Sequence, residues 1–176
     1  MDGAVSASMR QMGVNFRMNF GVGVPRIKEI SRKYEPGIEL AERLWEEDVR
    51  ELKILATMLV PLDEATEEMT HRWGKAISNQ EIREQACKNL FQELPFAARL
   101  VESWGKDTDE AVRATGYWLF TRLCITRSGG GNDAGMEQVL TRAVADLKSD
   151  SLLLYQAALN ALRFYGRASS TRSSWV

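Results

Sequence analysis

Three basic residues recur at a fixed place in the sequence, where they could bind phosphate groups. They are Lys53, Arg83 and Arg113, and each lies 30 residues after the one before it. Each follows an apolar residue and comes three positions before a small residue, as in Ile82-Arg83-x-x-Ala86. Cations in register match the repeated negative charge of a nucleic-acid backbone. The spacing therefore predicts a row of cations that contacts DNA.

The same cations also have a structural interpretation. Helical repeats often place a basic residue at this position to pair with an acid of the adjoining repeat, and several glutamates lie nearby in the sequence: Glu51, Glu81, Glu84 and Glu110. Unpaired cations on the binding face would favour DNA as the partner. Cations that are each neutralised by a neighbouring acid would favour a scaffold that binds a protein. Both interpretations stay open at this point.

Other side chains fit catalysis or metal binding poorly. The two cysteines, Cys87 and Cys124, suit neither a disulfide framework nor a metal cluster. The single histidine, His71, excludes a histidine-rich metal site and lies in an exposed-looking stretch with no matched nucleophile. The glycines at 129–131 are not followed by the Gly-Lys-Ser/Thr of a phosphate-binding loop. We expect neither a metal nor a cofactor.

The elements that position these residues are predicted to be helices. Apolar residues recur at helical spacing, and we find no run of alternating apolar and polar residues typical of a strand. Asp107–Asp109 and Ser149–Ser151 are typical of helix N-caps. The pattern also predicts helices between the aligned positions, at 62–77, 96–104 and 136–147. The fold class is therefore predicted to be all-α.

The helices repeat. The aligned positions begin at Leu52, Ile82, Val112 and Leu153, at intervals of 30, 30 and 41 residues. A period of this length with two helices in each repeat is the signature of a HEAT-class solenoid. We predict a right-handed α-solenoid of HEAT-like helix pairs with a concave binding face, forming one domain over residues 1–176. Within it we expect an N-terminal helix at 1–18, a flexible glycine-rich loop at 128–135 and a tail at 168–176.

Composition and charge narrow the class of protein. Hydrophobic residues make up 44% of the chain and charged residues 27%, which is typical of soluble globular proteins. No apolar run approaches the ~20 residues of a membrane span, and no secretory signal is visible, so we expect a cytoplasmic protein without membrane contact. The net charge of −1 divides into +3 for residues 1–35, −8 for 36–110 and +4 for 111–176. The acidic middle favours a protein partner, whereas the basic ends favour DNA.

Several stretches together resemble a known family. They read Phe20-Gly21-Val22-x-Val24-Pro25-x-Ile27, Leu44-Trp45-Glu46-Glu47, Arg50-Glu51-x-x-Ile54-Leu55-Ala56 and Ala157-x-x-Asn160-Ala161-Leu162-Arg163-x-Tyr165. In these the chain is similar, over about Asn19 to Tyr165, to the DNA alkylation repair family, HEAT-like-repeat DNA glycosylases that remove cationic alkylated purines. The resemblance implies duplex DNA as the partner, either lesion-containing or distorted.

The resemblance also implies roles for single residues. The arginine with which the family grips the DNA backbone matches Arg113. The family's catalytic aspartate matches Glu84, and its two active-site tryptophans match Gln80 and Asn160. Both aromatic side chains are therefore replaced by amides, and the carboxylate is one methylene longer. A plainer interpretation of Glu84 is a solvated acid that pairs with Lys88 one turn later.

These replacements bear on the chemistry that the resemblance implies. Loss of a cationic purine creates positive charge at the sugar, which a carboxylate stabilises. Tryptophan faces attract the cationic base by about 0.5–2 kcal/mol each. We therefore expect a DNA-binding protein with weakened or absent excision, in which Lys53 and Arg83 assist Arg113. The further residues expected to bind DNA are Arg163, Gln80 and Asn160. The alternatives are an active DNA glycosylase that hydrolyses the N-glycosidic bond with Glu84, and a solenoid scaffold that binds a protein. Near the C-terminus, Arg163, Arg167 and Arg172 could contact phosphates or solvate a last helix.

Overall fold

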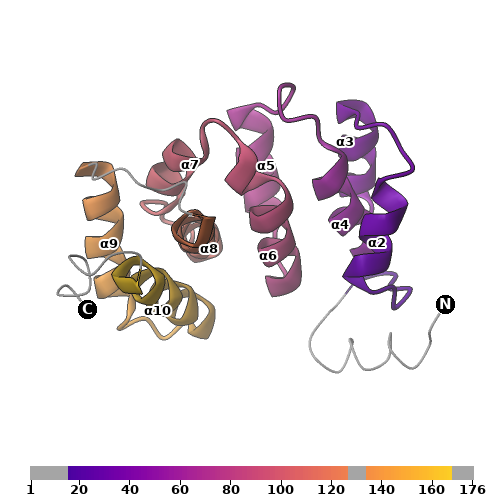
Figure 1. Cartoon of the computed structure of the whole chain (residues 1–176). Helices are drawn as coiled ribbons and strands as arrows, with labels where there is room; N and C mark the ends of the chain where they lie inside the picture. Colours follow the sequence, from indigo (N-terminus) through magenta and orange to yellow (C-terminus); the bar gives the residue numbers. More distant parts are fainter. Residues whose placement is uncertain (1–15, 127–133, 168–176) are drawn as a thin grey trace. The chain divides into compact units, whose positions relative to one another are not determined.

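The computed structural model describes residues 16–126 and 134–167, and helices dominate this part of the chain (Figure 1). They are α2 (Val24–Ser31), α3 (Ile38–Glu46), α4 (Arg50–Leu59), α5 (Glu67–Ala76), α6 (Gln80–Asn89), the 3-10 helix η1 (Phe91–Glu93), α7 (Ala97–Trp104), α8 (Glu110–Thr126), α9 (Ala134–Asp146) and α10 (Leu152–Arg167). Among the described residues, β pairing is confined to an isolated bridge between Met18 and Val49. The predicted all-α fold class is confirmed.

The helices belong to two compact units, which are described separately. The first unit contains α2, α3, α4 and α6. The second unit contains α5, η1, α7, α8, α9 and α10. One domain over residues 1–176 stays a prediction.

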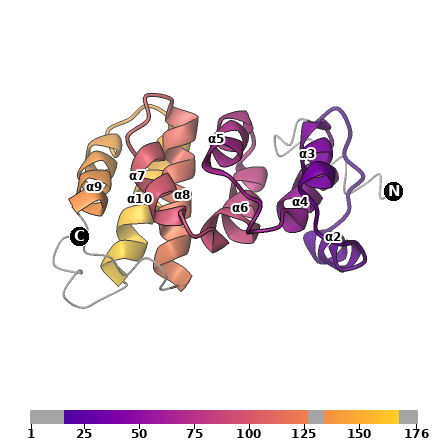
Figure 2. The same cartoon turned by 90° about the horizontal axis from the view of Figure 1, so that it is seen from above.

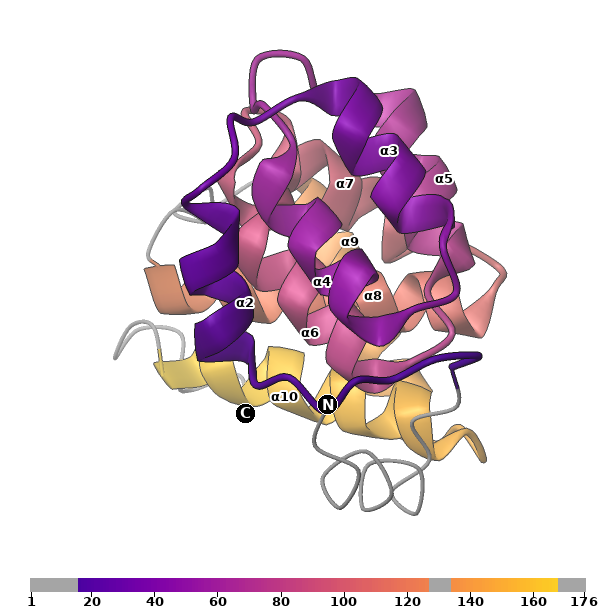
Figure 3. The same ribbon diagram turned by 90° about the vertical axis from the view of Figure 1, so that its right-hand side faces the viewer.

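In the first unit, α4 is the central helix. It packs against α2, α3 and α6, and Figure 3 shows it beside α2 and α3. Trp45, Ile54 and Ile82 lie in the buried core of this unit. The start of α6 is fixed by Asn79, whose side-chain oxygen accepts hydrogen bonds from the amides of Glu81 and Ile82. This N-cap satisfies two of the amides that a helix start leaves without a backbone partner.

The chain before α2 is extended where it can be described. The Met18 amide donates to the carbonyl of Asp48, and the Met18 carbonyl accepts from the amide of Arg50, both at 3.3 Å. The helix predicted for residues 1–18 therefore does not include residues 16–18, because their backbone groups bond to the turn before α4. Residues 1–15 lie outside the described part of the chain.

In the second unit, α8 packs against α7 and α10 (Figure 2). The approach to α7 requires a small residue, because a Cβ added at Gly116 would lie 2.8 Å from the amide nitrogen of Gly105 and 2.9 Å from the Cβ of Trp104. Trp104 is fully buried, and its indole nitrogen donates to Nδ1 of His71 at 2.6 Å. His71 thus serves the packing of this unit. Of the stretch predicted to be exposed, Thr70 is buried and His71 half-buried, whereas Arg72 is exposed.

The helices predicted at 96–104 and 136–147 are found within two residues of their predicted bounds, as α7 and α9. The helix predicted at 62–77 begins only at Glu67, because the amide of Glu64 bonds to the carbonyl of Pro61 and closes a turn. The caps predicted for α8 and α10 are confirmed: Asp109 accepts from the amides of Ala111 and Val112, and Ser151 accepts from the amide of Leu154. Of the predicted loop at 128–135, residues 134 and 135 begin α9. The rest of that loop and the tail at 168–176 lie outside the described residues.

Candidate nucleic-acid interface

Arg113 lies inside the second unit rather than on its surface. Its side chain is 5% exposed, and Nε donates to Oδ2 of Asp146 at 2.8 Å while Nη1 donates to the carbonyl of Asp107 at 2.7 Å. The hydroxyl of Tyr117 donates to the same Asp146 oxygen at 2.6 Å. Burial, together with this hydrogen bond, raises the pKa of Tyr117. Arg113 is therefore neutralised by an acid of the next helix pair.

The position of Asp146 in the chain shows which helices the ion pair with Arg113 joins. Asp146 is the last residue of α9, and the chain turns directly after it into α10. The ion pair therefore fixes the end of α9 to the start of α8. Arg113 is in consequence a positioning residue that joins α8 to α9, and its contact with DNA stays a prediction.

Lys53 and Arg83 are held within the first unit. The ammonium of Lys53 donates to the carbonyl of Trp45 and lies 5.0 Å from the centre of the Trp45 ring. Arg83 is 1% exposed, and its Nη1 donates to the side-chain oxygen of Gln80 at 3.0 Å. Burial lowers the pKa of both cations. The common spacing of these residues thus marks positions close to the core, and their contact with DNA stays a prediction.

Gln80 and Glu84 lie together on α6. Nε2 of Gln80 donates to Oε1 of Glu84 at 2.9 Å, while its oxygen accepts from Arg83. Glu84 is exposed, so its carboxylate is open to solvent, and the hydrogen bond from Gln80 orients it. A carboxylate in this setting can accept hydrogen bonds or position water. Its predicted catalytic role stays a prediction.

Asn160 and Arg163 lie on a solvent-facing stripe of α10. Arg163 is exposed and Asn160 half-buried, and the adjacent exposed side chains on this face are Gln156 and Arg167. Spacings of three and four residues place the four side chains on one side of the helix. We call Gln156, Asn160, Arg163 and Arg167 the α10 stripe. Since α10 reads LLLYQAALNALRFYGR, it contains two cations and no acid.

The opposite side of α10 explains why the stripe faces outward. Ala157, Ala158 and Ala161 are fully buried, together with Leu154, and α10 packs against α8. Alanines allow two helices to approach closely, while the polar residues between them are left at the surface. Sequence reasoning identified Arg163, Asn160 and Arg167 but overlooked Gln156. The signal that would have found it is the i, i+4 spacing of polar residues in an alanine-rich helix without acids.

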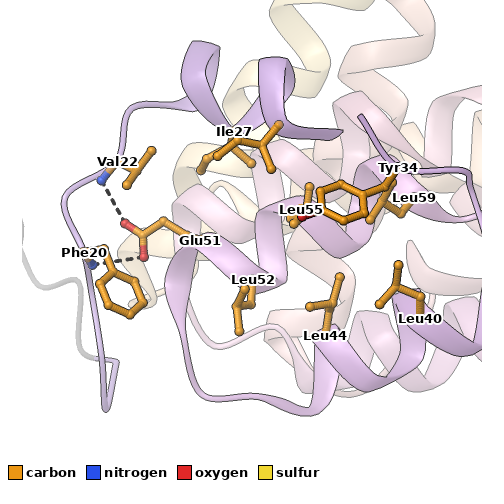
Figure 4. Close-up of a pocket in the computed structure, with 11 residues that line it drawn as sticks. Phe20, Val22, Ile27, Tyr34, Leu40, Leu44, Glu51, Leu52, Leu55 and Leu59 are labelled. Atoms are coloured by element: carbon orange, nitrogen blue, oxygen red, sulfur yellow. Dashed lines mark hydrogen bonds between the residues drawn. The ribbon is translucent and has the colours of Figure 1, made fainter. Parts of the chain in front are cut away.

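An apolar groove of about 470 Å³ lies in the first unit (Figure 4). Its walls are formed by α2, α3, α4 and the segment before α2. Glu51 lines one end, where its carboxylate accepts from the amides of Phe20 and Val22, both at 3.1 Å. None of the site residues predicted from the sequence lines this groove. The groove is therefore separate from the residues to which a role in DNA binding or excision was assigned.

No group of three or more histidine, cysteine, aspartate or glutamate side chains among the described residues could hold a metal ion. No helix among these residues is both long enough and apolar enough to cross a bilayer.

Comparison with known proteins identifies the fold and the family. A solved structure, described as "a new family of proteins related to the HEAT-like repeat DNA glycosylases with affinity for branched DNA structures", matches 97% of this chain and 73% of its own, with a TM-score of 0.85 and 16% identity. This likeness confirms the predicted HEAT-like repeat fold. No functionally curated protein matches the sequence significantly. The family model described as "DNA alkylation repair enzyme" matches residues 2–174, and the chain therefore belongs to the DNA alkylation repair enzyme family.

Proposed function

We propose that this protein binds distorted, damaged or branched duplex DNA and that the α10 stripe contacts the DNA backbone. The observation that carries the proposal is the stripe itself, where exposed Arg163 and Arg167 share one face with two amides on a helix without an acid. Membership of a DNA repair family supports DNA as the partner. The described affinity of the structural relative supports branched DNA as the substrate class.

The chemistry of the stripe suits a phosphate backbone. Arg163 and Arg167 are one helical turn apart, about 6 Å along the axis, so both guanidinium groups can reach phosphates of one strand. Asn160 and Gln156 carry amides that donate and accept hydrogen bonds, which suits both sugar–phosphate and base edges. Neither arginine has an acidic partner among the described residues, so no ion pair within this part of the chain competes with a phosphate.

Excision is proposed to be weak or absent in this protein. In the resemblance, Gln80 and Asn160 replace the two tryptophans whose faces would attract a cationic base. An amide has no aromatic face, so the attraction between a tryptophan ring and a cationic base is lost. A second function, glycosylase activity that uses Glu84, is favoured by one observation: the Glu84 carboxylate is exposed and oriented by Gln80.

The test is fluorescence anisotropy with labelled DNA at several salt concentrations. The probes are a four-way junction, a duplex of equal length and the same duplex with an abasic-site analogue. We expect the junction to bind more tightly than the duplex. The double variant Arg163→Gln with Arg167→Gln should bind all three probes more weakly. Its slope of log affinity against log salt should be shallower by about two phosphate contacts.

A matched control separates the stripe from general surface charge. Arg26→Gln removes a similarly exposed cation on α2, where Arg26 pairs with Glu29 at 2.6 Å. This variant should keep the wild-type affinity and salt slope. If Arg26→Gln lost as much DNA affinity as the double variant Arg163→Gln with Arg167→Gln, a specific role for the α10 stripe would be contradicted. Absence of binding by the wild type at low salt would overturn DNA binding altogether and leave the protein-binding scaffold.

A further inference from the structure

The first turn of α10 carries two large side chains that face solvent. Leu152 is 67% exposed and Tyr155 is 38% exposed. They are three residues apart and therefore neighbours on the helix surface. Single exposed apolar side chains are common and require no explanation. This pair differs from isolated exposed side chains because it lies on the same helix as the α10 stripe.

Leu152 lies on the same face as the α10 stripe. Intervals of four, four, three and four residues lead from Leu152 through Gln156 and Asn160 to Arg163 and Arg167. At 3.6 residues per turn, these positions stay within about 80° of one another around the helix axis. Leu152 is about 16 Å from Arg163 along the axis. One surface of α10 thus presents an apolar end, two amides and a cationic end.

This order of side chains matches the chemistry of a DNA branch point. Arginines hold phosphates on any duplex, whereas an apolar side chain gains little there, because the bases of an intact duplex are stacked on one another. At a branch or a distorted step, base faces become accessible, and leucine or tyrosine side chains can contact them. The two ends of α10 would therefore serve different purposes: general affinity at the cationic end and selectivity at the apolar end.

We infer that Leu152 and Tyr155 contact unstacked bases at a DNA branch point while Arg163 and Arg167 hold the adjacent phosphates. The inference rests on the proposed function, since it assumes that α10 faces DNA. It goes further in assigning the discrimination between branched and intact DNA to two named side chains.

The experiment compares dissociation constants for a four-way junction and for a duplex of equal length. We expect Leu152→Ala and Tyr155→Ala to weaken junction binding by about 5- to 20-fold each, the effect of losing a base contact. Duplex affinity and the salt slope should stay at wild-type values, because no phosphate contact is removed. Tyr155→Phe keeps the ring and should keep the selectivity.

Val144→Ala is the matched control. Val144 is 54% exposed on α9 of the same unit, and its truncation should leave both dissociation constants unchanged. As a second readout, 2-aminopurine at the branch point should be quenched by the wild type and less by Tyr155→Ala.

The outcomes separate the inference from the proposed function. Junction selectivity that persists in Leu152→Ala and Tyr155→Ala would overturn the inference while DNA binding stands. Equal losses on junction and duplex would overturn it as well, because the pair would then act on general affinity. A wild-type protein that binds neither probe would overturn both proposals.

Discussion

Arg113 is predicted from the resemblance to contact the DNA backbone, whereas the structure buries it against Asp146. Truncation to alanine leaves Asp146 buried without its main cationic partner, since Arg142 is 3.9 Å away and largely exposed. Breaking a buried ion pair in this way costs about 3–5 kcal/mol. We expect Arg113→Ala to lower the free energy of unfolding by that amount, measured by urea denaturation followed by circular dichroism.

Arg142→Ala is the control for this prediction. It removes a cation near the same carboxylate, but an exposed pair of this kind contributes about 0–1 kcal/mol. DNA titrations with the folded fraction of Arg113→Ala then separate the two roles. A positioning residue leaves the salt slope unchanged, whereas a phosphate contact makes the slope shallower by about one. A stable Arg113→Ala protein with a shallower slope would contradict the positioning role.

Tyr117 makes stability depend on alkaline pH. Burial and the hydrogen bond to Asp146 raise the pKa of Tyr117 in the folded state above the value of about 10 in an unfolded chain. The folded protein therefore binds this proton more tightly than the unfolded chain does. The resulting stability is fully present below about pH 10 and is lost as the pH rises further.

The Tyr117→Phe variant isolates this effect. It should be less stable than the wild type at pH 8 by about 1–3 kcal/mol, because Asp146 loses a donor. All other side chains are the same in the two proteins, so their contributions cancel in the comparison. Urea denaturation at pH 8 and pH 11 should show the wild type losing more stability than the variant. Equal losses in the two proteins would be evidence against a shifted Tyr117.

At the scale of elements, the contact between α7 and α8 depends on Gly116. Replacing an exposed glycine within a helix by alanine usually stabilises the protein by about 1 kcal/mol. At Gly116 the added methyl group would lie 2.8 Å from the amide nitrogen of Gly105 and 2.9 Å and 3.0 Å from Cβ and the carbonyl carbon of Trp104. We expect Gly116→Ala to be destabilising by about 1–3 kcal/mol by thermal and urea unfolding.

Gly37 offers the comparison for Gly116. A Cβ at Gly37 would meet nothing within 4 Å, and its φ of −166° is an extended conformation open to any residue. Gly37→Ala should therefore change stability little. A Gly116→Ala protein as stable as the wild type would mean that α7 and α8 separate without cost.

Helices were the part of the fold that the sequence could predict. Apolar residues at i, i+3 and i+4 indicate which face of a helix is buried. A cap residue such as Asp109 bonds to amides only two and three residues away, so it can be recognised from the neighbouring sequence. The turn at Pro61 was missed because Leu62 continues the apolar pattern without joining the helix. A pattern of hydrophobicity does not record where a backbone hydrogen bond closes a turn.

The candidate site was harder to predict, for a physical reason. The repeat period places Lys53, Arg83 and Arg113 at one position of the helix pair, but a period does not tell which way that position faces. Arg113 is buried because Asp146, 33 residues later, offers a carboxylate. Arg163 was found through the family resemblance. Gln156 needed the observation that the alanine face of α10 packs on α8.

At the scale of the whole molecule, net charge differs between the part of the chain that contains the α10 stripe and the part that contains Glu84. Arg163 and Arg167 belong to residues 111–176, which carry +4, whereas Glu84 belongs to residues 36–110, which carry −8. Phosphate binding is therefore expected from the C-terminal part of the chain. A carboxylate in the acidic part adds repulsion towards DNA, unless it takes part in chemistry on the substrate.

Glu84→Gln distinguishes these possibilities. If Glu84 does no chemistry, removing its charge should leave junction affinity within about twofold of the wild type or slightly tighter. Release of methylated purines, followed by chromatography, should be close to the uncatalysed rate in both proteins, because Gln80 and Asn160 offer no aromatic face for the base. Glu137→Gln makes the same charge change at an exposed position of α9 and serves as the control. Measurable base release by the wild type that disappears in Glu84→Gln but persists in Glu137→Gln would establish the glycosylase alternative. In that case Glu84 would stabilise the positive charge at the sugar, as the aspartate does in the family.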